Sequence, residues 1–212
     1  HEGCGYYSLF RKTGNDGSQQ SFFSKQGQGD ILEFLDDYLP RYNVSKSSGY
    51  ISFITCNHDT PRMTRSFDES ECKIADAFLL LMPGVPFLYY GDEIGMQYFP
   101  LKSVEGGYNR TGSRTPMQWT NGKNLGFSNA AKEKLYLPVD GRDCAPTVES
   151  QEQDSNSLLN TVRKVLALRH ANPDLQATPN FEVIYAEKKK YPFVFRRGKF
   201  VIAVNPSCRE TN

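Results

Sequence analysis

The chain has 212 residues, which suffices for one domain of ordinary size or for one large piece with a small appendage. Its 25 basic and 24 acidic residues give a formal charge of +1, so neither nucleic acid nor a membrane surface is expected as a partner. No apolar stretch approaches the roughly 20 residues that span a bilayer. Because the chain opens on His1, with no initiator methionine or signal-like segment, we expect it to be a piece of a longer polypeptide.

The five cysteines are odd in number and show no Cys-x-x-Cys spacing. This pattern favours neither a zinc site nor a disulfide scaffold, and unpaired thiols are more typical of a reducing compartment, although the localisation stays open. Cys56 is interpreted as a small apolar strand residue rather than as a nucleophile, because His58 is the one candidate base among its neighbours.

The first elements in chain order are a loop and a helix. Residues 1–28 are rich in Gly, Ser and Gln and predict a long loop, with a short hairpin at the turn 14–17. Asp30 with Glu33 forms the pattern of a capping box, and apolar residues at helical spacing predict a helix over 30–39 that ends before Pro40.

A buried strand is predicted next, over residues 51–56, and it ends in the polar sequence Asn57-His58-Asp59. Pro61 favours a rigid loop directly after it. Groups with chemical roles are commonly found there, beyond the carboxyl ends of parallel strands. The alternative is that His58 and Asp59 only satisfy each other and the loop backbone.

The following segment repeats the pattern of strand, helix and strand. Asp68 and Glu71 predict a second capping box, at the start of a helix that Pro83-Gly84 ends, and residues 85–90 predict a second apolar strand. Two buried strands joined through a helix form a parallel βαβ unit. The polar groups after both strands, including Asp92 and Glu93, should therefore share one edge of the sheet.

The rest of the chain divides into a long loop, a helix and short strands. Residues 91–153 form a connection longer than is usual for a loop without a function. Within it, residues 108–119 combine hydrogen-bond donors with Tyr and Trp, as sugar-binding sites do. The alternative is a loop that its own Arg and Trp side chains hold in place. A helix is predicted over 157–170, with Leu168 among its inward residues. Short antiparallel strands are predicted over 181–185, 191–195 and 200–204. We accordingly divide the chain into domains at 1–172 and 173–212.

Three motifs, in their order and spacing, resemble those of the α-amylase superfamily, glycoside hydrolase family thirteen; they lie at 53–59, 83–93 and 114–119. The resemblance runs from about residue 6 to the C-terminus and matches the ends of the seventh and eighth barrel strands. It implies the fold class α/β, namely the C-terminal part of an eight-stranded β/α barrel followed by an incomplete antiparallel β-sandwich domain. It also implies an enzyme that acts on α-glucosidic bonds with retention, as α-amylases and α-glucosidases do on starch fragments and maltodextrins.

The resemblance also implies roles for single residues. Asp59 matches the third carboxylate of the family, which grips sugar hydroxyls and favours the charged transition state, and it is our candidate catalytic residue. Six further residues are implied to bind substrate: Asn57, His58, Arg62, Arg114, Gln118 and Trp119. Asp92 and Glu93 are expected to orient the loop and its arginines.

No residue of 1–49 resembles the nucleophile or the acid/base of the family, so this chain alone is expected to be inactive. No cofactor or metal is expected from these residues, and calcium in the intact enzyme stays open, as do bond type, endo or exo attack, and hydrolysis against transfer. Two alternatives are a trehalose synthase-like isomerase and a non-catalytic amylase-like scaffold. The chain supplies only a few strands, and these would have open edges and exposed apolar faces. It is therefore expected to self-associate.

Overall fold

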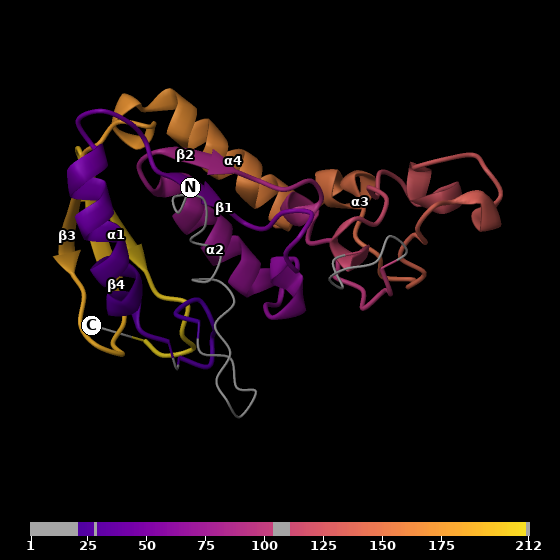
Figure 1. Cartoon of the computed structure of the whole chain (residues 1–212), viewed down its shortest axis with the longest axis horizontal. Helices are drawn as coiled ribbons and strands as arrows, with labels where there is room; N and C mark the ends of the chain where they lie inside the picture. Colours follow the sequence, from indigo (N-terminus) through magenta and orange to yellow (C-terminus); the bar gives the residue numbers. More distant parts are fainter. Residues whose placement is uncertain (1–20, 28, 104–110, 211–212) are drawn as a thin grey trace.

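The computed structural model describes residues 21–27, 29–103 and 111–210 (Figure 1). The hairpin expected at 14–17 and the part of the loop motif at 108–110 lie outside these residues. Within them, one parallel sheet of two strands and one antiparallel sheet of three strands pack with four α-helices.

Helix α1 spans Ile31–Ser45 and begins where the sequence predicts. The side chain of Asp30 caps it by accepting a hydrogen bond from the amide of Leu32. The predicted end before Pro40 is wrong, because the helix continues through Pro40 to Ser45. Pro40 lies on the solvent side of the helix, where water can satisfy the carbonyl it leaves unbonded, and the next turn buries Tyr42.

The parallel sheet consists of β1, Ser52–Ile54, and β2, Val85–Phe87, in the predicted βαβ arrangement. Both strands are shorter than the predicted ranges 51–56 and 85–90. Phe53 points toward the helices and is buried against the rings of α1. Register partners share a face, so Val85 and Phe87 lie together on the opposite face, which is open in this chain.

Helix α2, Glu69–Leu81, connects the two strands, and α4, Leu158–Ala171, packs alongside it (Figure 1). The capping box of Asp68 and Glu71 is present as predicted, and Ser157 caps α4. One inward residue of α4 was predicted wrongly. Leu168 is exposed, and Arg169 is buried instead, where its guanidinium donates to three backbone carbonyls at the end of α2 and the turn into β2, those of Leu80, Met82 and Gly84.

The antiparallel sheet contains β3, Phe181–Tyr185, β4, Phe193–Arg197, and β5, Phe200–Val204, in the order β3-β4-β5. A tight turn at Gly198, whose φ is +53°, joins the last two strands. Strand β4 lies two residues later than predicted, and its last residue, Arg197, is fully buried. Its guanidinium donates to the carbonyl of Leu81 on α2 and to three carbonyls before β3, those of Asp174, Gln176 and Thr178. Burial, and then the charge of Arg169, lower the pKa of Arg197 to about 10.

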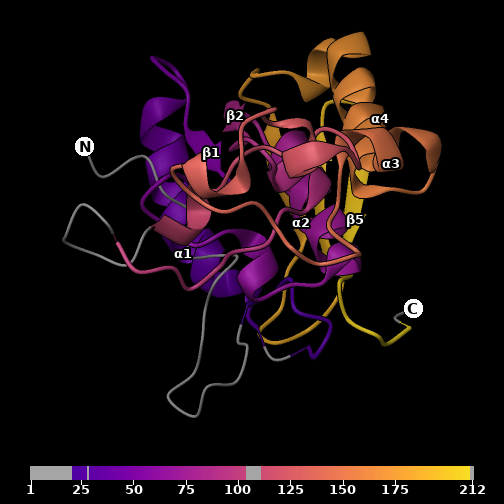
Figure 2. The same ribbon diagram turned by 90° about the vertical axis from the view of Figure 1, so that its right-hand side faces the viewer.

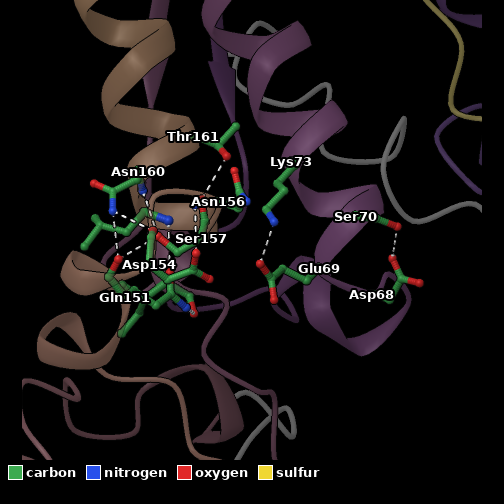
Figure 3. Close-up of polar contacts among 12 residues, drawn as sticks. Asp68, Glu69, Ser70, Lys73, Gln151, Asp154, Asn156, Ser157, Asn160 and Thr161 are labelled. Atoms are coloured by element: carbon green, nitrogen blue, oxygen red, sulfur yellow. Dashed lines mark hydrogen bonds and ion pairs between the residues drawn. The ribbon is translucent and has the colours of Figure 1, made fainter.

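The long connection after β2 folds into short helical turns and α3, Val148–Gln153, at the end of the molecule away from the antiparallel sheet (Figure 1). Figure 2 looks onto this end. Polar side chains join α3 to the start of α4, since Ser157 and Asn160 both donate to the carbonyl of Gln151, and the Oε1 of Gln151 accepts from the amide of Leu159 (Figure 3).

One hydrophobic cluster runs through both predicted domains. Phe78 of α2 contacts the rings of Phe193 and Phe195, and Tyr42 of α1 contacts Phe181. The two predicted domains therefore share one hydrophobic core. Their division at residue 172 stays a prediction. In the described part of the chain, Cys56, Cys72, Cys144 and Cys208 form no disulfide, and no helix is long and apolar enough to cross a membrane.

One face of the parallel sheet carries exposed apolar side chains, and self-association of the chain stays a prediction. Phe87 is 56% exposed, Val85 and Tyr50 are exposed beside it, and no third strand among the described residues pairs with β1 or β2. Apolar faces and free strand edges pair readily with other chains. We expect light scattering to show a dimer or a larger assembly at micromolar concentration. A stable monomer with a cooperative melt would contradict this.

Candidate active site

The residues after β1 form a tight turn that presents two ionisable side chains. The Oδ1 of Asn57 accepts from the amide of Asp59 at 2.8 Å, and the hydroxyl of Thr60 accepts from the amide of Asn57 at 3.0 Å. This local pairing satisfies the backbone after the strand. It leaves the side chains of His58 and Asp59 pointing to the surface, where they are 62% and 46% exposed.

The carboxylate of Asp59 lies between two nitrogen-bearing side chains. The Nε2 of His58 is 3.2 Å from one carboxylate oxygen, and the guanidinium of Arg114 donates to the other at 3.0 Å. Arg114 also donates from Nε to the backbone carbonyl of His58 at 2.9 Å. The structure therefore brings together two of the predicted motifs, which are more than fifty residues apart in the chain.

Arg62 does not lie where the resemblance implied. Its side chain is 0% exposed and packs against the adjacent rings of Tyr89 and Tyr90, and it forms an ion pair of 2.9 Å with the buried Asp92. All of these contacts are to protein groups, so in this structure Arg62 acts inside the fold. Its implied sugar contact stays a prediction. The expectation that Asp92 orients an arginine of this region matches the geometry.

Gln118 and Trp119 differ in exposure, and their implied roles in binding substrate stay predictions. Gln118 is buried, and its side-chain amide donates to the carbonyl of Pro146. Trp119 is 50% exposed, while its backbone carbonyl accepts from the amide of Glu149, which fixes the loop. Trp119 can therefore offer a ring face to a ligand. Gln118 stabilises the loop through its hydrogen bond to Pro146.

A buried acidic group lies next to the Arg62–Asp92 pair. Both carboxyl oxygens of Asp76, on α2, are without a hydrogen-bond partner among the described residues. Burial raises the pKa of Asp76 well above its usual range, and the charges of Asp92 and Glu93 raise it further. Burial likewise raises the pKa of Glu93, with a further contribution from Asp92. Arg62 pairs with Asp92, whereas Asp76 has no cationic partner among the causes that shift its pKa.

Stability should therefore depend on pH through Asp76. Its pKa is higher in the folded chain than in the unfolded one, so the folded state binds more protons between these two values and the free energy of unfolding falls as pH rises through that interval. Asp76→Asn carries no such proton. We expect its melting temperature, relative to that of the unchanged chain, to increase from about pH 5 to about pH 8. The exposed Asp143→Asn serves as control. If the difference in melting temperature between Asp76→Asn and the unchanged chain were the same at both pH values, the raised pKa of Asp76 would be contradicted.

The donor groups here do not form a metal site. Among the residues that the structure describes, no group of three or more His, Cys, Asp or Glu side chains could hold a metal ion. The chemistry that the arrangement offers is that of a fixed anion, flanked by hydrogen-bond donors, at the ends of two parallel strands.

A family model described as alpha amylase, catalytic domain, matches residues 16–178, which is most of the chain. The chain belongs to the α-amylase family.

Relatives of this α-amylase family member include enzymes that are named for different activities. The trehalose synthase/amylase TreS of Mycobacterium tuberculosis is 45% identical over 111 residues, which cover 50% of this chain and 18% of that protein. A probable oligo-1,6-glucosidase of Bacillus subtilis is 32% identical over 162 residues, which cover 60% of this chain and 28% of that protein. The chain thus spans less than a third of the length of either relative.

Solved structures confirm the predicted fold. The α-amylase of H. orenii superposes with a TM-score of 0.64 at 27% identity, over 82% of this chain and 33% of that one. The trehalulose synthase MutB of Pseudomonas mesoacidophila superposes with a TM-score of 0.69 at 20% identity, over 82% of this chain and 38% of that one. The α-amylase family member described here therefore has the fold of the C-terminal part of the β/α barrel, followed by an incomplete antiparallel β domain.

Sequence reasoning missed Asp76 in this α-amylase family chain. The residue lies in a helix whose neighbours Ala75 and Leu80 are buried, and the helix was interpreted by its apolar pattern alone. The available signal was its spacing, since Cys72, Asp76 and Leu80 follow one another at four-residue intervals on one face.

Proposed function

We propose that this chain forms the C-terminal part of the catalytic domain of an enzyme that acts on α-glucosidic bonds with retention. The observation that carries the proposal is the half-exposed carboxylate of Asp59, placed after β1 and held between His58 and Arg114. A non-catalytic scaffold would gain nothing from an anion fixed at this position. A glycosidase would gain from it, because its transition state resembles an oxocarbenium ion.

Each residue of the site then has a role. Asp59 stabilises the positive charge that develops on the sugar, and the donors of His58 and Arg114 hold its carboxylate in place and bind sugar hydroxyls. Asn57 fixes the turn through the amide of Asp59. Trp119 offers a ring face to a neighbouring sugar. We assign neither the nucleophile nor the acid/base to residues of this chain, which on its own is proposed to be inactive.

Two reactions fit this site. The first is hydrolysis of maltodextrins or starch fragments. The second is isomerisation by transfer of a glucosyl group, as in a trehalose synthase, and the 45% identity to the mycobacterial trehalose synthase/amylase over half of the chain favours it equally. Both reactions need the same stabilisation of charge, so the site described above serves either.

The product formed from maltose distinguishes the two reactions. The intact enzyme that contains this chain would be incubated with maltose, and the sugars separated by anion-exchange chromatography. Glucose as the main product supports hydrolysis, and trehalose as the main product supports isomerisation. Absence of turnover on maltose, maltotriose and isomaltose would contradict the proposed function.

A further inference from the structure

The buried guanidinium of Arg62 connects three segments that are distant in the sequence. It donates to the carboxylate of Asp92 at 2.9 Å and to the carbonyl of Tyr90 at 2.6 Å, both after β2. It also donates to the carbonyl of Ser113, in the long connection, at 3.1 Å. The second oxygen of Asp92 accepts from the thiol of Cys56, at the end of β1, at 3.0 Å.

The residues on both sides of Arg114 also bond directly to the segments that follow the two strands. The hydroxyl of Ser113 donates to the carbonyl of Thr60 at 2.6 Å, and the hydroxyl of Tyr90 donates to the carbonyl of Thr115 at 2.8 Å. Arg114 therefore lies between two fixed residues. From there its side chain reaches the carbonyl of His58 and the carboxylate of Asp59.

Stability alone is a poor explanation for the pair. Two charges that are 0% and 2% exposed lose their hydration, and replacing such a pair with apolar residues is often neutral or stabilising. The Nε of Arg62, moreover, has no hydrogen-bond partner within the described residues. What an apolar pair cannot reproduce is the directed donation to Ser113.

We propose that Arg62 and Asp92 are positioning residues, which place the segment 111–115 so that Arg114 holds the carboxylate of Asp59. This inference deepens the proposed function, since it rests on Asp59 as the working carboxylate. It gives Arg62 a role without contact to substrate. It also explains why Cys56, Arg62 and Tyr90, from separate segments, donate to Asp92 or to the segment 111–115.

The test measures hydrogen exchange at the Nε–H of Arg114 by NMR in the chain as it exists, with the resonance assigned through Arg114→Lys. Two variants are compared with the unchanged chain. Arg62→Lys keeps the charge that compensates Asp92. Its single ammonium group lacks the second nitrogen with which the guanidinium donates to the carbonyl of Ser113. The double variant Arg62→Met, Asp92→Leu removes both charges together.

We expect exchange at Arg114 to become about tenfold faster or more in both variants, which corresponds to the loss of about one hydrogen bond. The double variant should melt within a few degrees of the unchanged chain. The Nε–H of Arg41, which donates to Asp37 on α1 at 3.0 Å, serves as control and should not change.

Unchanged exchange at Arg114 in a folded variant would overturn the proposal, because the loop would then hold Arg114 without the pair. Loss of folding in both variants would also overturn it, since the pair would then act through core stability. A faster rate in Arg62→Lys alone is sufficient support if the double variant does not fold. The measurement needs no turnover, so its failure is distinct from failure of the proposed function.

Discussion

Asp59→Asn in the intact enzyme is expected to lower kcat on α-glucosides by about 100-fold or more, with the fold retained. The change keeps the shape of the side chain, including an oxygen that can accept from Arg114, but removes the anion that stabilises the developing charge. The magnitude follows from the usual cost of removing one pre-organised electrostatic group. Steady-state kinetics on maltose would measure it.

The control for this prediction is Asp143→Asn, an exposed residue outside the site. It should leave kcat within about twofold, because an isolated surface charge contributes little. If Asp59→Asn kept activity within a few-fold of the unchanged enzyme while its melting temperature was the same, Asp59 would lose its assigned role.

Arg197→Met is expected to cost at least about 3 kcal/mol of unfolding free energy, because several buried acceptors would lose their donor at once. The side chain is fully buried and serves the carbonyls of Leu81, Asp174, Gln176 and Thr178. Urea denaturation followed by circular dichroism would give the difference from the shift of the midpoint.

The adjacent residue provides a matched control. Arg196 lies on the same strand with its side chain on the solvent side, where it forms an exposed ion pair with Glu182. Arg196→Met should change the free energy of unfolding by about 0.5 kcal/mol or less. Equal losses in the two variants would show that the carbonyl contacts of Arg197 are not what stabilises the fold.

The sequence was informative where local chemistry decides the structure. Asp68 and Ser157 begin helices because their side chains satisfy free amides, and this depends on residues within one turn. The loop after β1 was predicted from Pro61, and in the structure Asn57 also bonds an amide two residues away. The family resemblance added the C-terminal part of the barrel, which local pattern alone does not specify.

The differences concern residues whose surroundings come from elsewhere in the chain. The family resemblance implied sugar contacts for Arg62 and Gln118, and both side chains are buried by segments about thirty residues distant or more. Arg169 and Arg197 were missed because a polar residue within an apolar pattern is interpreted as a surface residue. A guanidinium can be buried wherever carbonyls converge, and their convergence depends on the tertiary fold.

The carbonyls at the end of α2 have a consequence for synthesis on the ribosome. Arg169, which bonds the carbonyl of Leu80, comes 89 positions later in the chain. Arg197, which bonds the carbonyl of Leu81, comes 116 positions later. At typical rates of elongation this interval is on the order of ten seconds. During it the nascent α2 can form its capped N-terminus, but its C-terminal turn can mature only when the hairpin carrying Arg197 has emerged from the exit tunnel.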